Sequence, residues 1–129
     1  MKRLDGKVAV IIGAAAKDNM AQVIARRYAD ENAKVVVAGR KEETLKEFAD
    51  EINASYALCD ITKKDDIESL SKFAVDTYGK VDIAINCAGW GLLEKLQKTT
   101  EEQLNAVTAL HLNGSFFFLQ VFAGQMSET

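Results

Sequence analysis

The chain has 129 residues, of which 48% are hydrophobic and 27% are charged, and its formal net charge is −3. This length and composition are typical of one soluble globular domain with a core of reasonable size. The charge balance excludes a basic nucleic-acid-binding surface, and no apolar run approaches the roughly 18 residues of a membrane span, so we expect neither nucleic acid nor membrane as a partner.

The first unit predicted from the N-terminus is a strand followed by a turn and a helix. A short apolar run over 8–12 predicts a buried strand, which ends before Gly13. Apolar residues then recur at helical spacing, at Met20, Val23, Ile24 and Tyr28. A helix that follows a strand in this way presents free backbone N–H groups and the positive end of its dipole, so this corner suits an anion.

The loop between that strand and that helix consists of small and polar residues. The alanines at 14–16 are small enough for the backbone to approach a phosphate closely, and Asp18 or Asn19 can cap the helix through a side-chain oxygen. The loop has one glycine, at Gly13, whereas the dinucleotide-binding fingerprint has three. The residues alone leave two interpretations open, a pyrophosphate site and a plain strand-to-helix turn.

The middle of the chain alternates strands with amphipathic helices. Strands are predicted over 34–40, 55–59 and 81–86. The apolar faces of the two intervening helices are Leu45, Phe48, Ala49 and Ile52 in one and Ile67, Leu70, Phe73, Ala74 and Tyr78 in the other. Thr62 and Asp65 predict a capping box for the second helix, and Gly79 predicts its end. This alternation predicts right-handed crossovers and a parallel sheet with helices on both faces.

The last part of the chain predicts a second small-residue turn and one long helix. The turn spans 87–91 at the carboxyl end of a strand, where α/β proteins bind their ligands, and a loop to Lys98 follows. Thr99 and Glu102 predict a capping box for the helix, which is apolar nearly all round its second half. We expect this half to be sandwiched or used as an interface, with Gly114 permitting a bend or close packing.

The two cysteines, Cys59 and Cys87, each lie at the end of a predicted strand and lack the paired spacing of a metal site. We therefore expect two reduced core thiols and no metal. The first six residues lack the apolar core of a signal peptide, so the expected location is the cytoplasm.

Five short motifs occur in order along the chain: Gly-Ala-Ala-Ala at 13–16, Gly-Arg-Lys at 39–41, Cys-Asp-Ile at 59–61, Asn-Cys-Ala-Gly at 86–89 and His-Leu-Asn-Gly at 111–114. Together they resemble the short-chain dehydrogenase/reductase family over essentially the whole chain. The resemblance implies a Rossmann-like doubly wound α/β fold with strand order 3-2-1-4 in the part present. It implies one dinucleotide-binding domain over 1–129, with NAD(P) across the switch between the first and fourth strands.

The resemblance also assigns the cofactor's pyrophosphate to the first loop. That loop looks like the divergent loop of the enoyl-acyl-carrier-protein reductases, and by this resemblance Asn19 and the N–H of Met20 would meet the pyrophosphate, with Gly13 as another cofactor-binding residue. The other cofactor-binding residues that it implies are Asp60 at the adenine amino group, Ile61 beside the ring, and Asn86, Ala88 and Gly89 along the adenosine ribose. The alternative for Asp60 is a helix-capping role.

Cofactor choice depends on the end of the second strand. An NAD enzyme places a carboxylate there for the ribose hydroxyls, but this chain has Gly39 followed by Arg40 and Lys41. A guanidinium binds a 2′-phosphate through charge-assisted hydrogen bonds, so we favour NADP(H) over NAD(H), with Lys17 as a helper. The alternative is that Arg40 and Lys41 merely begin a solvated helix.

Catalytic residues of the family are mostly missing from this sequence. His111 occupies the place of the family's helical asparagine, where it would maintain a proton relay or serve as a buried, hydrogen-bonded structural histidine. The family's serine and its tyrosine with lysine four residues on are not present. The resemblance thus implies the cofactor-binding portion of an NADP(H)-dependent oxidoreductase that interconverts a small carbonyl compound and an alcohol, without its C-terminal catalytic part.

Two other functions stay open. The missing tyrosine and lysine, with the phenylalanine-rich last helix, suit a non-catalytic nucleotide-binding or assembly module. The first loop alone suggests an enoyl-thioester reductase. Since the family often pairs helices like the last one here, we also expect a homo-oligomer formed through that helix.

Overall fold

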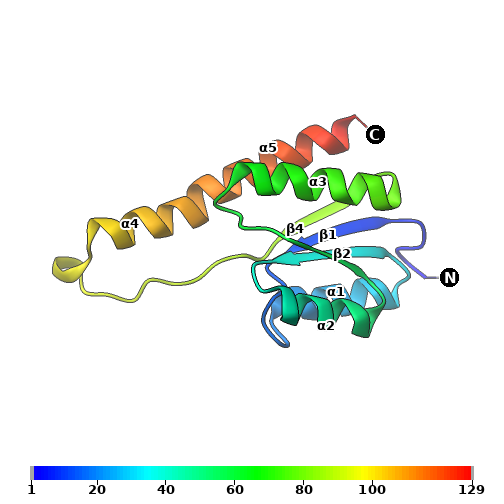
Figure 1. Cartoon of the computed structure of the whole chain (residues 1–129), viewed down its shortest axis with the longest axis horizontal. Coiled ribbons are helices and arrows are strands. Elements are labelled where there is room, and N and C mark those ends of the chain that lie inside the picture. The colour runs from blue at the N-terminus through cyan, green and yellow to red at the C-terminus, as the bar shows by residue number, and fades with distance from the viewer. Residues whose placement is uncertain (1, 129) are drawn as a thin grey trace.

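The computed structural model describes residues 2–128, which form a parallel sheet between two layers of helices (Figure 1). Within this range the sheet consists of β1 (Val8–Ile12), β2 (Lys34–Gly39), β3 (Ser55–Leu58) and β4 (Ile83–Asn86). All neighbouring pairs are parallel, and the strand order is β3-β2-β1-β4. The predicted fold class and strand order are therefore confirmed.

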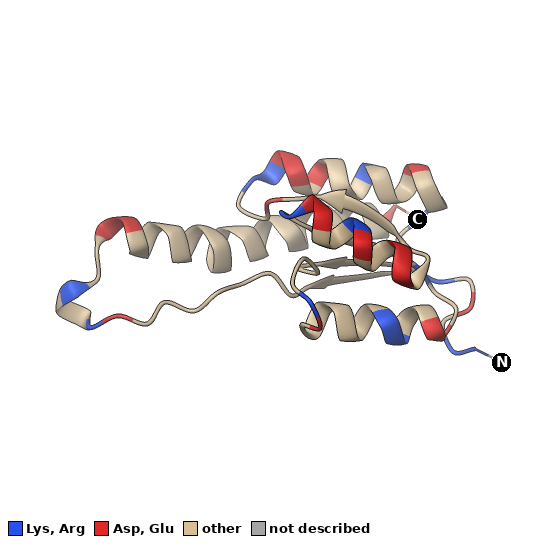
Figure 2. Cartoon of the chain, turned by 60° about the horizontal axis from the view of Figure 1, so that its bottom comes forward, with Lys and Arg blue, Asp and Glu red and all other residues tan. Residues whose placement is uncertain are grey.

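Helices cover both faces of this sheet. Figure 1 shows α1 (Met20–Asp30) and α2 (Glu42–Ile52) on one face and α3 (Lys64–Tyr78) and α5 (Gly114–Ser127) on the other. A 3₁₀ turn (Leu96–Lys98), α4 (Glu101–Thr108) and a π-helical turn (Ala109–Asn113) lie between β4 and α5. The 3₁₀ turn and α4 extend away from the sheet (Figures 1 and 2).

Alternation along the central strands divides the core in two. Val10, Ile12 and Val36 pack with the α3 and α5 side, whereas Ile11 and Val37 pack with the α1 and α2 side. Every residue of β1 is buried, as expected for the middle strand of a parallel sheet. Burying each valine or isoleucine side chain of β1 stabilises the fold by about 1.5–3 kcal/mol, so β1 is held firmly and fixes the position of the loop that follows it.

Helix caps agree with the sequence at the first helix and differ at two others. Asn19 caps α1, as one of the two predicted candidates. The predicted Thr62–Asp65 capping box is wrong: α3 begins after Lys63, and Thr62 instead donates its N–H and hydroxyl to Asp60. This local turn competes with the cap for the same side chain.

The other capping error is a shift by one residue. The box that opens α4 is Thr100 with Gln103, not Thr99 with Glu102. The hydroxyl of Thr99 donates instead to the carbonyl oxygen of Lys95, at the end of the 3₁₀ turn. Gly79 ends α3 with a left-handed φ of 87°, as predicted.

The buried face of α1 also differs from the prediction. Met20 and Val23 are exposed, and the buried residues are Ala21, Gln22 and Ala25. Small side chains let the helix axis approach the sheet closely, so the two alanines take the inner face and the larger apolar residues are left outside.

The last helical stretch, Glu101–Ser127, is long and apolar enough by length and composition to cross a membrane. From Gln103 onward it has no Lys, Arg, Asp or Glu, and Figure 2 shows it almost free of charge beyond its beginning. Phe118 and Phe122 are buried against the core, while Phe116 and Leu119 are exposed on the opposite side. One face of α5 thus packs against the core, whereas the other face is exposed. The helix is therefore not sandwiched on both sides within the described residues.

Candidate functional site

A cleft of about 530 Å³ opens at the carboxyl ends of the strands. The parallel register aligns Ile12 at the end of β1 with Ala38 in β2 and Asn86 in β4, so the three following loops meet at one edge of the sheet. The cleft is lined by Ile12, Gly13, Ala15, Ala16, Asn19, Gly39, Arg40, Lys41, Cys59, Asp60, Ile61, Thr62, Cys87, Ala88, Gly89, Trp90, Ala106, Ala109 and Leu110. This is the switch point of the sheet, where ligands of open α/β folds bind.

Gly13 brings the first loop against the end of β4. Its φ is +98°, and a Cβ at this position would lie 2.7 Å from the amide nitrogen of Ala88. Only glycine fits both the conformation and the contact. The first loop and the β4 loop therefore form adjoining walls of the cleft.

The N-terminus of α1 faces the same cleft through Asn19. Its Oδ1 accepts a hydrogen bond from the N–H of Gln22 at 3.0 Å, and its Nδ2 donates to the carbonyl oxygen of Gly13 at 2.7 Å. The N–H groups of Met20 and Ala21, in the first turn, have no intrahelical acceptor. This arrangement leaves backbone donors and a positive dipole end beside Asn19, which lines the cleft, and such a helix start suits an anion.

The end of β2 supplies two cations. Arg40 and Lys41 line the cleft, are exposed, and form no ion pair within the part of the chain that the structure describes. Lys41 is the N-cap residue of α2, where a positive charge opposes the helix dipole. Two cations without an ion-pair partner at a helix N-terminus are more consistent with a bound anion than with the alternative that they only begin a solvated helix.

Gly39 precedes these cations and is itself tightly packed. A Cβ at Gly39 would lie 2.9 Å from the Cβ of Ala15 in the first loop. The site thus has no carboxylate at this position and little space for one. The contact also keeps the first loop close to β2.

Asp60 lies across the cleft from the first loop and is held in a turn. Its Oδ1 accepts from the Thr62 hydroxyl at 2.7 Å and from the Thr62 N–H at 3.0 Å. Partial burial acts to raise its pKa, but these bonds, with the positive charges of Arg40 and Lys63, hold the pKa below its ordinary value. Asp60 is therefore a fixed carboxylate acceptor, and the suggested role as the α3 cap is not found.

The turn after β4 forms the remaining wall. Asn86 Oδ1 accepts from the N–H of Ala88 at 2.9 Å and so tightens the turn, but Asn86 itself does not line the cleft. Ala88 and Gly89 do line it. His111 packs directly against Gly89: a Cβ added at Gly89 would lie 2.9 Å from the imidazole Cε1.

His111 is exposed and hydrogen-bonded, with Nε2 2.7 Å from the carbonyl oxygen of Trp90. The expectation of a buried histidine is therefore wrong, because its helical stretch turns away from the sheet at this point. Lys17 and Met20, two other predicted site residues, are exposed and do not line the cleft.

The two cysteines differ in their surroundings. Cys59 is buried, and burial, with the nearby Asp66 and Asp60, raises its pKa to about 12. Cys87 is half-buried, packs against the core on the α1 and α2 side and also lines the cleft, and burial raises its pKa. The expectation of a core thiol therefore holds only in part for this residue. Neither forms a disulfide, and residues 2–128 contain no cluster of His, Cys, Asp and Glu suited to a metal ion.

Sequence reasoning missed the wall formed by the last helical stretch. Ala106, Ala109 and Leu110 line the cleft, and their helical spacing signalled only a helix face. Trp90 also lines it, and its place within the small-residue turn at 87–91 was the one signal for this position. Which side of the helix meets the cleft depends on tertiary packing.

Comparisons with known proteins agree with this geometry. A family model described as short chain dehydrogenase matches residues 7–129. An uncharacterized oxidoreductase of Staphylococcus epidermidis is 31% identical over 122 residues, which cover 93% of this chain and 52% of that protein. An NAD-dependent glycerol dehydrogenase of Listeria innocua is 37% identical over 126 residues, covering 95% of this chain and 48% of that protein.

Solved structures give the same result for the fold. A short-chain type dehydrogenase/reductase from Mycobacterium marinum superposes with a TM-score of 0.90 at 29% identity, covering 97% of this chain and 52% of the other. A short chain dehydrogenase from Mycobacterium smegmatis has a TM-score of 0.92 at 24% identity, covering 98% and 54%. The chain spans about half the length of the proteins it matches.

Proposed function

The chain belongs to the short-chain dehydrogenase family, and from this premise we propose that it forms the dinucleotide-binding portion of an NADP(H)-dependent oxidoreductase that interconverts a small carbonyl compound and an alcohol. The observation that carries the proposal is the cleft at the switch point, with the N-terminus of α1 on one side and Arg40 and Lys41 on another. The dinucleotide, when bound, supplies the hydride-transfer chemistry, and the protein positions it.

The residues of the cleft fit such a cofactor at three points. The N–H groups at the start of α1 would receive the pyrophosphate. The carboxylate of Asp60 and the side chain of Ile61 would hold the adenine. Ala88 and Gly89, at the turn that Asn86 tightens, would line the adenosine ribose.

The preference for NADP(H) rests on charge at the end of β2. A carboxylate there would repel a 2′-phosphate, whereas the unpaired guanidinium of Arg40 binds it through charge-assisted hydrogen bonds. Lys41 adds a second positive charge, and Lys17 is a more distant helper. The glycerol dehydrogenase of Listeria is NAD-dependent, so the family alone does not decide the choice.

Catalysis requires groups that the described residues lack. No tyrosine in the chain is followed by a lysine four residues on, and His111 does not line the cleft but is hydrogen-bonded to the carbonyl oxygen of Trp90, which does. Hydride transfer and proton exchange are thus proposed for a protein of which these residues are a part. We also propose a cytoplasmic location, and a homo-oligomer that buries the exposed side of the last helical stretch, which includes Leu112, Phe116 and Leu119.

Calorimetric titration of the chain with NADPH and NADH tests the proposal. We expect both to bind, and NADPH to bind at least tenfold more tightly, as one strong charge-assisted contact provides. Equal affinities would contradict the NADP(H) preference, and absence of binding would contradict the site. The matches described above favour neither the non-catalytic module nor the enoyl-thioester reductase.

A further inference from the structure

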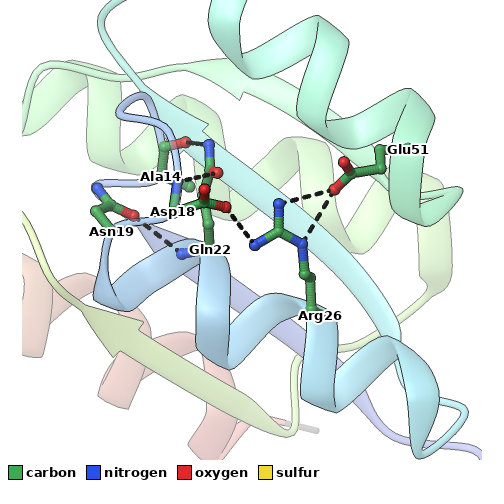
Figure 3. Close-up of polar contacts among 6 residues, drawn as sticks. All are labelled: Ala14, Asp18, Asn19, Gln22, Arg26 and Glu51. Carbon is green, nitrogen blue, oxygen red and sulfur yellow. Dashed lines mark hydrogen bonds and ion pairs between the residues drawn. The ribbon is translucent and has the colours of Figure 1, made fainter.

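The loop between β1 and α1 is held in shape by side chains of α1. Figure 3 shows Gln22 and Arg26, one turn apart on the helix, both directed at Asp18 at the end of this loop, with Gln22 also reaching Ala14 at its start. In a three-glycine loop the backbone itself supplies the tight turn and the close approach to phosphate. Here Asp18 takes a left-handed φ of 56° without being glycine, so other contacts must stabilise that conformation.

Gln22 fixes the backbone at two points of the loop. Its side chain is 2% exposed, its Nε2 donates to the carbonyl oxygen of Ala14 at 2.8 Å, and its Oε1 accepts from the N–H of Asp18 at 2.9 Å. Both polar ends of the buried amide are satisfied, so any other side chain would leave a loop group without its partner. One side chain thereby spans the loop from its start to its end.

Arg26 fixes the only acidic side chain of the loop. It pairs with Asp18 at 2.9 Å and with Glu51 of α2 at 3.0 Å, and its guanidinium lies 5.1 Å from the ring centre of Phe48. A free carboxylate at the start of α1 would repel a phosphate bound there. The ion pair offsets that charge and ties the loop to α2, the helix that follows Arg40 and Lys41.

We propose that Gln22 and Arg26 are positioning residues that replace the missing glycines, holding the first loop in the shape that receives the pyrophosphate of the dinucleotide. Gln22 sets the backbone, and Arg26 holds and neutralises Asp18. This inference rests on the proposed function, because it assigns the two residues to the same site. Neither residue lines the cleft, so both act through the loop.

The test compares a ligand that has the pyrophosphate with one that lacks it. Calorimetry of the chain with NADPH and with adenosine 2′-monophosphate separates the two halves of the site, since the second ligand has only the adenine, ribose and 2′-phosphate. Gln22→Met, which keeps the length but not the hydrogen bonds, should weaken NADPH about tenfold and adenosine 2′-monophosphate less than about twofold. A role confined to overall folding would weaken both ligands alike.

Arg26 gives a second, surface variant that does not depend on the buried amide. Arg26→Met should weaken NADPH about threefold, as expected for a partly exposed ion pair, and Asp18→Asn added to it should restore the affinity. Arg27→Met is the matched control, because Arg27 pairs with Glu31 at the C-terminal end of the same helix, away from the loop.

The outcomes separate this inference from the proposed function. If the wild-type chain binds no dinucleotide, the proposed function fails and this inference fails with it. If the wild type binds NADPH but both variants leave its affinity unchanged relative to adenosine 2′-monophosphate, only the positioning role is overturned. Loss of affinity in Arg26→Met that Asp18→Asn does not restore would overturn the charge argument.

Discussion

The imidazole Nε2 of His111 lies 2.7 Å from the carbonyl oxygen of Trp90, twenty-one positions earlier in the chain. A carbonyl oxygen only accepts, so Nε2 carries the hydrogen and the other ring nitrogen is not needed for this contact. His111 belongs to the π-helical turn, and such turns are frequent at functional sites. The bond links the last helical stretch to the segment that lines the cleft beside Gly89.

His111→Leu should release this segment. Trp90 is the only tryptophan of the chain and its side chain is 43% exposed, so its fluorescence reports the change directly. We expect red-shifted emission, faster quenching by acrylamide and a loss of about 0.5–1.5 kcal/mol in the free energy of unfolding. His111→Asn, which keeps a side-chain donor, is the control. Unchanged quenching in the leucine variant would mean that the segment is held by other contacts.

Gly13→Ala should destabilise the chain and narrow the cleft. The new Cβ would meet the amide nitrogen of Ala88 at 2.7 Å in a left-handed conformation, at a cost of about 1–3 kcal/mol or more. Gly124→Ala is the control, because Gly124 lies within α5 with open space around it and should gain about 0.5–1 kcal/mol. Urea unfolding measures both, and equal effects would contradict the close approach of the two loops.

Local pattern was enough to predict much of this fold. The apolar run at 8–12 and the one within 34–40 predicted two buried strands, and Gly79 predicted the end of α3. Each of these signals depends only on neighbours in the sequence. The strand order came from the resemblance and not from the residues alone. The two capping errors arose where several Thr and Asp side chains compete for the same backbone groups.

The sequence predicted residues in the loops that line the cleft, but not the side chains outside the cleft that hold those loops in place. Small residues after a strand indicate a ligand-binding turn, so Gly13, Ala88 and Gly89, which line the cleft, were predicted as site residues. Gln22 was not predicted, because the hydrophobic pattern of a helix does not mark a polar residue as buried. Its contacts with the loop depend on how the loop before α1 folds back onto the helix. The exposed position of His111 depended likewise on where the long helix leaves the sheet.

Arg40→Asp should reverse the cofactor preference in part. Removing the guanidinium and placing a carboxylate near the 2′-phosphate should weaken NADPH relative to NADH by about 10- to 100-fold. Lys34→Asp makes the same kind of charge reversal at the opposite end of β2 and should leave the ratio unchanged. Calorimetry with both nucleotides measures the ratio, and an unaltered ratio in Arg40→Asp would contradict the assignment.

Asp82 should contribute stability that is lost in acid. The Lys80 ammonium at 2.9 Å and the N–H of Val8 at 2.9 Å outweigh partial burial and lower its pKa in the folded state. A lowered pKa means that the contribution is present above the unfolded pKa near 3.8 and is lost as the pH falls through the folded value. Asp82→Asn should therefore flatten the fall in unfolding free energy below about pH 4. Asp76→Asn, which removes a surface carboxylate, serves as the comparison.

Cys87 should be the thiol that reports occupancy of the cleft. It is half-buried and lines the cleft, whereas Cys59 is buried with a pKa of about 12 and has almost no thiolate at neutral pH. The thiolate is the reactive form of cysteine, so iodoacetamide should modify Cys87 well before Cys59. Because burial raises the pKa of Cys87 as well, its thiolate fraction, and with it the modification rate, should rise with pH. Peptide mass spectrometry distinguishes the two sites without any substitution. Saturating NADPH should slow the modification of Cys87 by covering its thiol. Free adenine, which lacks the pyrophosphate, should protect Cys87 less. Equal modification rates with and without NADPH would place the dinucleotide outside this cleft.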